Sequence, residues 1–424
     1  MKEGNKKPNS IDDIYIVPEL LEEILHGLPL KSILKFKAVS KQWRSILESD
    51  LFMERRMNVQ KNRRKILAAY NCNYGRRPCI LPAETRFQGD EEIVYLHCDP
   101  ALPSMTCDGL VCITEPDWFN VLNPSTGELR RFPPGPDPVK GAHANWLLGF
   151  GRDKVTGSYK IVRMCFDDCY ELGLLDVGTG EWSQLMPPPH IIDAGSKSVH
   201  VNGSIYWLQI RRYYSILTLD LHKQRFYRVP YPDTWVTQET QLVNLEDRLA
   251  ISMTTKVGPG EWTLEIWCMD LEEIRWSKNI SWNTYSWSKT YSISLPHRVV
   301  VSRPWQEISW FTPVSVSKQG NIVFYDNHKR LFRYCPGTDE IRCLSSNICV
   351  ISSYVEELVP LPFKSGHPHH DLENSYSKFR TSKCRPGSWI SKVLRRNVSM
   401  LDVLVASLVV VGYVYLPPKK LRII

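Results

Sequence analysis

The 424-residue sequence predicts a mainly β fold with a small helical module at its N-terminus. Three observations support this prediction. Apolar residues make up 43% of the chain, which is enough for a sizeable buried core. The 14 Trp, 19 Tyr and 29 Pro are typical of aromatic strands separated by rigid turns. Helical periodicity is concentrated in residues 17–52, whereas short strand and turn patterns follow after residue 65.

Three helical patterns follow one another in the N-terminal module. The first begins at Pro18, which suits the first turn of a helix, and ends at Gly27 and Pro29. The second places apolar residues from Ile33 onward on one face, and Ser40 offers a cap for the third. Because about forty residues bury little apolar surface, we expect the module to need a partner. Periodicity alone leaves open whether that partner is another protein or the β domain.

A run of short motifs follows these helices: Pro18-Glu19-Leu20, Glu23-Ile24-Leu25, Leu28-Pro29, Lys31-Ser32-Ile33-Leu34, Val39-Ser40-Lys41-Gln42-Trp43 and Ser49-Asp50-Leu51-Phe52. Together they resemble an F-box over residues 14 to about 55, and the domain is placed at 14–60. Ser40 stands where the family commonly has Cys, and Val17 where Leu usually precedes Pro. The resemblance implies binding to the Skp-type adaptor of a cullin-RING ubiquitin ligase. The residues at matching interface positions are Pro18, Leu20, Ile24, Pro29, Val39 and Trp43.

A strand, turn and strand pattern repeats along the β-rich region. Its copies begin at Asn123, Asp176, Asp220, Asp270 and, more loosely, Cys335, at spacings of 53, 44, 50 and 65 residues. These spacings are near the forty to fifty residues of a propeller blade. A second element places a turn before a buried strand, as the inner hairpin of a blade requires. It occurs at Gly109, Gly203, Asp247 and Gly320. The repeats favour a β-propeller, with a β-sandwich as the alternative.

This region also resembles the plant F-box-associated domain, which implies a kelch-like propeller over residues 66–363. The motifs that carry the resemblance form an ordered set between residues 105 and 282. They are Asp108-Gly109-Leu110-Val111-Cys112, Asn123-Pro124-Ser125-Thr126-Gly127, Leu148-Gly149-Phe150-Gly151, Tyr159-Lys160-Ile161-Val162, Gly203-Ser204-Ile205-Tyr206-Trp207 and Leu264-Glu265-Ile266-Trp267.

The sequence carries no local signature of catalysis or of a cofactor site. The G-x-S-x-G, P-loop and H-E-x-x-H patterns do not occur, and Gly149-Phe150-Gly151 reads as a glycine pair at a strand turn. The carboxylate pairs Asp167-Asp168 and Glu272-Glu273 are expected at turns in solvent. His367, His369 and His370 lie in a polar linker, where a metal site is not expected. We therefore predict a non-catalytic chain without metal or cofactor, in a complex whose other subunits transfer ubiquitin.

Charge and cysteine patterns restrict the partners and the compartment. Residues 364–424 hold eleven Lys or Arg against three Asp or Glu, which accounts for the whole net charge of +8. The preceding 363 residues are therefore balanced, so the β domain is not expected to bind nucleic acid. The twelve Cys are irregularly spaced, and the polar N-terminus lacks a secretory signal. We expect reduced thiols in the cytosol or nucleus.

Substrate contacts are expected on loops at one rim of the β domain. Candidates come from two clusters rich in Arg, Tyr and Trp, the residue types that dominate binding hot spots. They are Arg211, Tyr213, Tyr214, Tyr285 and Trp287. Packing at blade edges is the alternative role.

A polar linker at 364–397 precedes an apolar segment at 398–416. The apolar segment approaches the length of a bilayer span. Asp402 would weaken that interpretation if it lay deep in the bilayer, but it lies close to one end of the segment, where its cost is smaller. A core strand or buried helix is the favoured interpretation, and a membrane anchor with the chain facing the cytosol is the alternative.

The function predicted from these observations is that of a substrate-recognition subunit of a Skp–cullin–F-box ubiquitin ligase. Its partners would be the Skp-type adaptor and a protein substrate. Two alternatives remain from the sequence: a ligand-binding or lectin-like propeller without a ligase role, and a membrane-tethered scaffold.

Overall fold

The computed structural model describes residues 17–61, 63–70, 84–88, 91–98, 104–115, 118–133, 135, 146–165, 171–188, 197–209, 215–232, 237, 239–277, 280–300, 309–356 and 361. These residues fall into two compact units, one ending at Arg56 and the other beginning at Met57. The predicted linker and the apolar segment lie outside the described residues.

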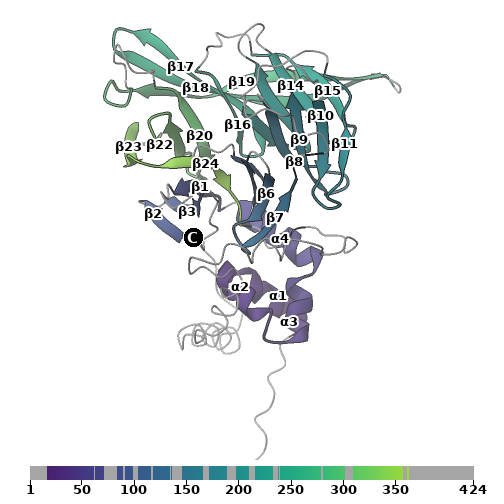
Figure 1. The fold of residues 1–424 in the computed structure, drawn as a ribbon. Coiled ribbons are helices and arrows are strands. Elements are labelled where there is room, and N and C mark those ends of the chain that lie inside the picture. Colours follow the sequence, from purple (N-terminus) through teal and green to yellow (C-terminus); the bar gives the residue numbers. More distant parts are fainter. Residues whose placement is uncertain are drawn as a thin grey trace, which may run out of the picture. The chain divides into compact units, whose positions relative to one another are not determined.

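The first unit is helical (Figure 1). Its helices are α1 (Pro18–His26), α2 (Leu30–Phe36), α3 (Lys41–Leu47) and α4 (Asp50–Lys61), of which α4 continues into the second unit. The first three confirm the predicted helices. As predicted, Ser40 caps α3, because its hydroxyl accepts a hydrogen bond of 3.1 Å from the backbone N–H of Trp43.

The fourth helix was not predicted, because its buried face lacks an apolar stripe. The face consists of Phe52, Arg56 and Gln60, and two of these three are polar. Arg56 is nevertheless well partnered, since its Nη1 donates to the carbonyls of His26 at 3.3 Å and Leu28 at 3.2 Å. It thereby satisfies carbonyls that the end of α1 leaves without helical partners. The packed core of the unit is apolar and includes Leu21, Leu25, Ile33, Leu47 and Phe52.

The second unit contains six four-stranded sheets, which we number as blades in chain order. Blade 1 comprises β4 (Ser104–Cys107), β5 (Leu110–Glu115), β6 (Trp118–Asn123) and β7 (Glu128–Phe132). Blade 2 comprises β8 (Leu147–Arg152), β9 (Tyr159–Cys165), β10 (Glu171–Asp176) and β11 (Trp182–Gln184). Blade 3 comprises β12 (Ser198–Val201), β13 (Ser204–Gln209), β14 (Ser215–Asp220) and β15 (Arg225–Val229).

Blades 4 and 5 repeat the same antiparallel order, and blade 6 differs from it. Blade 4 comprises β16 (Gln241–Leu245), β17 (Arg248–Gly258), β18 (Glu261–Ser277) and β19 (Ile280–Leu295). Blade 5 comprises β20 (Phe311–Val316), β21 (Ile322–Asp326), β22 (Leu331–Cys335) and β23 (Glu340–Ser345). Blade 6 has the order β2-β3-β1-β24 and comprises β1 (Lys65–Tyr70), β2 (Glu84–Gln88), β3 (Glu91–His97) and β24 (Cys349–Tyr354).

Blade 6 closes the ring with strands from both ends of the unit. β1 pairs with β3 in parallel and with β24 antiparallel, and Figure 1 shows the purple β1 beside the green β24. Each inner strand contacts the inner strand of the next blade, in the order β4, β8, β12, β16, β20, β24 and back to β4. This arrangement confirms the predicted β-propeller, fixes its blade number at six and excludes the sandwich.

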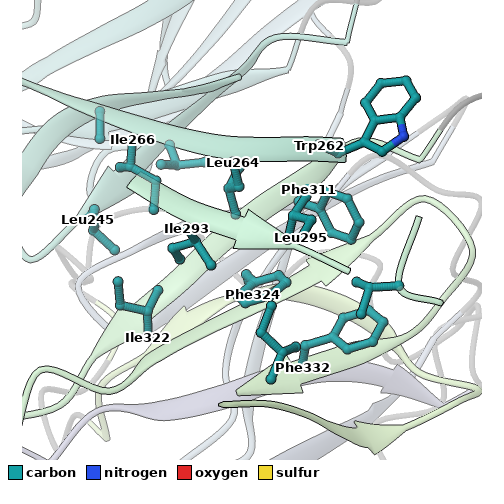
Figure 2. Close-up of a cluster of buried hydrophobic side chains, with 14 of the residues drawn as sticks. Leu245, Trp262, Leu264, Ile266, Ile293, Leu295, Phe311, Ile322, Phe324 and Phe332 are labelled. Atoms are coloured by element: carbon teal, nitrogen blue, oxygen red, sulfur yellow. The ribbon is translucent and has the colours of Figure 1, made fainter. Parts of the chain in front are cut away.

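Apolar side chains fill the spaces between blades. Figure 2 shows one such cluster, in which Leu264 and Ile293 of blade 4 face Phe324 of blade 5. The rings of Phe311 and Phe324 lie edge to face with centroids 5.7 Å apart. A blade cannot bury both of its faces alone, so these contacts hold the ring together.

The repeated turns follow the predicted chemistry at three of the Asx positions. In each, the side-chain oxygen accepts backbone N–H groups two and three residues ahead, as Asn123 does from Ser125 at 2.9 Å and from Thr126 at 3.3 Å. Asp176 and Asp220 do the same. The Cys335 copy forms a turn between β22 and β23 in which Cys335 stands at the position of the Asx residue.

The predicted turn at Asp270 is wrong, because β18 continues through this position to Ser277. The carboxylate of Asp270 accepts from Arg248 Nη2 at 2.6 Å and from the Ser288 hydroxyl at 3.3 Å, instead of from its own backbone. The pair Glu272-Glu273 therefore also lies in a strand and not at the turn expected for it. Asp167-Asp168 lies outside the described residues.

The inner hairpins are confirmed where a turn was predicted before a buried strand. Between β4 and β5, Asp108 and Gly109 have φ values of 44° and 79°, which suit a two-residue turn with both central residues left-handed. Asn202 and Gly203 make the equivalent turn between β12 and β13, with φ values of 48° and 81°.

The glycine pair Gly149 and Gly151 lies inside β8 and not at a turn, so the interpretation from the sequence is corrected. The physical reason is the close approach of blade 3. A Cβ at position 149 would lie 2.6 Å from the ring of Trp207, and one at position 151 would lie 2.5 Å from the ring of His200. The motif therefore makes room for side chains of the neighbouring blade.

We expect Gly149→Ala to lower the free energy of unfolding of the propeller by about 1–3 kcal/mol, because the added methyl overpacks a filled site. Urea denaturation of the full chain measures this change. Gly337→Ala is the matched control, since a Cβ at position 337 would meet no atom within 4 Å. Equal stability of the two variants would contradict the close-packing explanation.

Candidate functional site

The predicted adaptor-binding residues lie on the first three helices and the segments that join them. Leu20 and Ile24 are on α1 and are half-buried. Pro29 precedes α2 and is exposed, while Val39, between α2 and α3, is 58% exposed. Trp43 on α3 is half-buried and meets the ring of Phe36 edge to face at 5.2 Å. Pro18 begins α1, and its side chain lies outside the described part.

The apolar residues of α1 divide into two groups. Leu21 and Leu25 are buried in the helical core, whereas Leu20 and Ile24 keep part of their surface in solvent. We refer to Leu20, Ile24, Pro29, Val39 and Trp43 as the docking residues. Since none of them belongs to the buried core of the described unit, apolar surface remains there for a partner to cover.

A half-buried histidine at the end of α1 packs against α4. The His26 ring stacks on Phe52 with centroids 4.2 Å apart, and its Nε2 lies 3.5 Å from the Glu22 carboxylate. Burial lowers the pKa of His26, and Glu22 opposes that shift. His26 therefore acts as a packed aromatic group at neutral pH.

Of the substrate candidates, only Trp287 has a described side chain. It is half-buried and packs against a cluster of blades 3 and 4, and its Nε1 donates to the carbonyl of Pro230 at 2.9 Å. This contact corresponds to the blade-packing role. Tyr285 lies in β19, but its side chain is outside the described part, as are residues 211–214 and the three His of the linker.

The propeller encloses a central channel that the sequence did not indicate. It holds a cavity of about 460 Å³ lined by the inner strands of all six blades. Lys61, Arg64 and Asp247 are among the lining residues, and Arg64 Nη2 lies 2.9 Å and Lys61 Nζ 3.3 Å from the Asp247 carboxylate. Burial would raise the pKa of Asp247, but these two cations lower it further than burial raises it. Asp247 therefore stays ionised.

A thiol and an imidazole meet inside this channel. Cys107 Sγ, at the end of β4, lies 3.2 Å from His200 Nδ1 on β12. His200 Nε2 lies 3.1 Å from the carbonyl oxygen of Arg152 and 3.2 Å from its backbone nitrogen. The two residues are 93 positions apart, so sequence reasoning had no signal for the pair. Among the described residues, no three His, Cys, Asp or Glu are grouped as a metal site would require.

Comparison with protein families places both units. Residues 97–361 match the family model of the F-box associated beta propeller domain, and residues 16–55 match that of the F-box domain. The chain belongs to the F-box proteins with an F-box-associated propeller. This membership confirms the family that the sequence motifs indicated.

Curated plant relatives share nearly the whole length of this F-box protein. An F-box/kelch-repeat protein of Arabidopsis thaliana is 72% identical, covering 98% of this chain and 100% of its own. An F-box protein of the same plant is 68% identical over 94% of this chain and 98% of its own. An F-box/LRR-repeat protein, also from Arabidopsis thaliana, is 56% identical over 98% of this chain and 100% of its own.

The structure shows what the family motifs of this F-box protein do in the fold. They build the inner hairpins, the Asx turns and the tight blade contacts described above. The matched families are typically non-catalytic and do not indicate an enzyme. None of the helices in the described part is long and apolar enough to cross a membrane.

Proposed function

We propose that this F-box protein is the substrate-recognition subunit of a Skp–cullin–F-box ubiquitin ligase. In this proposal the F-box binds the Skp-type adaptor through the docking residues, and the propeller recruits a protein substrate. The observation that carries the proposal is the F-box match over residues 16–55, on helices whose docking residues keep apolar surface in solvent.

The docking residues suit a binding interface. An exposed Val and Pro beside a half-buried Trp offer apolar area that a partner can cover, and Trp is enriched in binding hot spots. The helical unit buries few large side chains of its own, so binding would also stabilise its fold. Docking and folding are thus expected to support each other.

The role of the propeller is positional. Ubiquitin transfer is assigned to other subunits, and this chain raises the local concentration of the substrate near them. The irregular spacing of the twelve Cys is the feature that favours a reducing compartment such as the cytosol or nucleus.

Co-expression of the full chain with a Skp-type adaptor and a cullin tests the proposal. We expect the three proteins to co-elute as one complex in size-exclusion chromatography. If the full chain elutes alone while its propeller remains folded by circular dichroism, the ligase role is wrong. The ligand-binding propeller without a ligase role would then be the remaining candidate, supported by the central cavity.

A further inference from the structure

The Cys107–His200 pair lies at the lining of the central cavity, and Cys107 also packs in a buried apolar cluster of blades 1 and 2. Both residues line the central cavity of about 460 Å³, a volume within the range of small-molecule sites. Cys107 itself is only 4% exposed, so large reagents have no direct approach to its thiol from outside. We therefore expect a reagent to approach Cys107 through the cavity.

The backbone of Arg152 orients the imidazole. Two neutral tautomers fit these contacts. When Nε2 is unprotonated, it accepts from the backbone N–H of Arg152 at 3.2 Å. When Nε2 carries the proton, it donates to the Arg152 carbonyl at 3.1 Å, and the lone pair of Nδ1 faces Cys107 Sγ at 3.2 Å. Burial lowers the pKa of His200, although the nearby carboxylate of Asp108 opposes the shift. The ring is therefore neutral at physiological pH, and its tautomer with the proton on Nε2 can accept the thiol proton at Nδ1.

A separate group in the same cavity lacks a protein partner. Thr312 of β20 lines the cavity and is only 7% exposed, yet its hydroxyl has no hydrogen-bond partner among the described residues. Leaving a buried hydroxyl unpaired costs free energy, so a polar molecule in the channel would be stabilised by bonding to it. This hydroxyl can donate to a carbonyl oxygen.

We propose that Cys107 is a modification site for small α,β-unsaturated carbonyl compounds that enter the propeller channel. The thiol proton passes to His200 Nδ1 as the sulfur forms a bond to the β-carbon of the compound. The π electron pair moves to the α-carbon, which then takes the proton back from the imidazolium. All atoms stay in the adduct, so the step needs neither oxidant nor leaving group.

The chain supplies its own reference thiols. Cys112 on β5 is fully buried, does not line the cavity, and burial raises the pKa of its thiol. Cys343 on β23 is exposed to solvent. Cys112 reports on unfolding, and Cys343 reports on the intrinsic reactivity of the reagent.

The test treats the native full chain with acrylamide and follows each cysteine by quantitative mass spectrometry of its peptides. We expect Cys107 to react while Cys112 does not. His200→Gln should slow the modification of Cys107 by about 100-fold, the lower end of what a positioned general base contributes. The rate at which Cys343 is modified should not change. His222→Gln is the matched control, because His222 lies at a turn of blade 3 and not in the channel lining.

Two results would overturn the proposal. One is that Cys107 reacts no faster than Cys112 in the wild-type chain. The other is that His200→Gln retains the wild-type Cys107 rate. Modification of Cys112 in the His200→Gln variant would show that this variant is unfolded. The proposal is then tested in the wild-type chain by comparing reagents of different size. Acrylamide should then modify Cys107 and a maleimide carrying a long polyethylene glycol should not, whereas modification by both reagents contradicts access through the channel. The measurement needs no adaptor, so it is independent of the proposed ligase role.

Discussion

Trp207→Ala is expected to lower the free energy of unfolding of the propeller by about 3–5 kcal/mol, the usual cost of truncating a buried aromatic side chain. Trp207 lies on β13 and is fully buried. Its ring packs so close to β8 that only a glycine fits at position 149. Its Nε1 also donates to the carbonyl of Leu148 at 2.7 Å. The substitution would leave a cavity between blades 2 and 3 and an acceptor without its donor.

Urea denaturation of the full chain, followed by circular dichroism, measures this effect. Trp118→Ala is the matched control, because Trp118 is 38% exposed and its loss should cost less than about 1 kcal/mol. Similar costs for the two variants would show that contacts between blades 2 and 3 do not stabilise the ring.

Asp153→Asn is expected to cost about 3–5 kcal/mol, because it removes one partner of a buried ion pair. The Asp153 carboxylate is almost fully buried and lies 3.2 Å from Lys160 Nζ, which also donates to the carbonyl of Leu221 at 2.8 Å. The pair thus ties the β8–β9 turn of blade 2 to blade 3. With Asn at 153, the ammonium of Lys160 would remain buried without its counter-charge.

The pH dependence gives this prediction a second readout. Burial would raise the pKa of Asp153, but the N–H groups of Val155 and Thr156 and the Lys160 ammonium hold it well below its usual range. A depressed folded-state pKa adds stability above the unfolded pKa, and that stability is lost as the pH falls through the folded value. The difference in the free energy of unfolding between wild type and Asp153→Asn should therefore be largest at pH 7 and begin to decrease below about pH 4.

Asp220→Asn is the matched control for this substitution. Asp220 makes the same kind of turn, accepting from the backbone of His222 and Lys223, but the ammonium beside it, that of Lys223, is on a side chain that is 64% exposed. Asn preserves the turn at both positions. A cost at Asp153 no larger than at Asp220, or a gap that does not change with pH, would contradict the role of the ion pair.

Features set by local chemistry were predictable from the sequence. The Asx side chains of Asn123, Asp176 and Asp220 bond to backbone only two or three residues ahead, so a short motif determines the turn. The cap at Ser40 is equally local. Family resemblance then connected these motifs to a propeller and an F-box.

Features that depend on distant partners were not predictable. Asp270 resembles the turn residues in sequence, yet its carboxylate accepts from Arg248 and the strand continues through it. The glycines of β8 reflect Trp207 and His200 on another blade. The pairing of β1 with β24 joins residues such as Lys65 and Tyr354, which no local pattern relates. The Cys107–His200 contact has the same non-local origin.

The affinity of the full chain for a Skp-type adaptor, measured by isothermal titration calorimetry with wild type and Val39→Glu, tests the central proposal most directly. Val39 is 58% exposed, so a charge at this position should leave the fold intact while opposing an apolar interface. We predict binding by the wild type and an affinity at least about 100-fold weaker for Val39→Glu, or roughly 2.8 kcal/mol. Val155→Glu, at a 62% exposed position on the propeller, should bind as the wild type does. Equal affinity of the two variants, or no binding by a folded wild-type chain, would contradict the proposed docking.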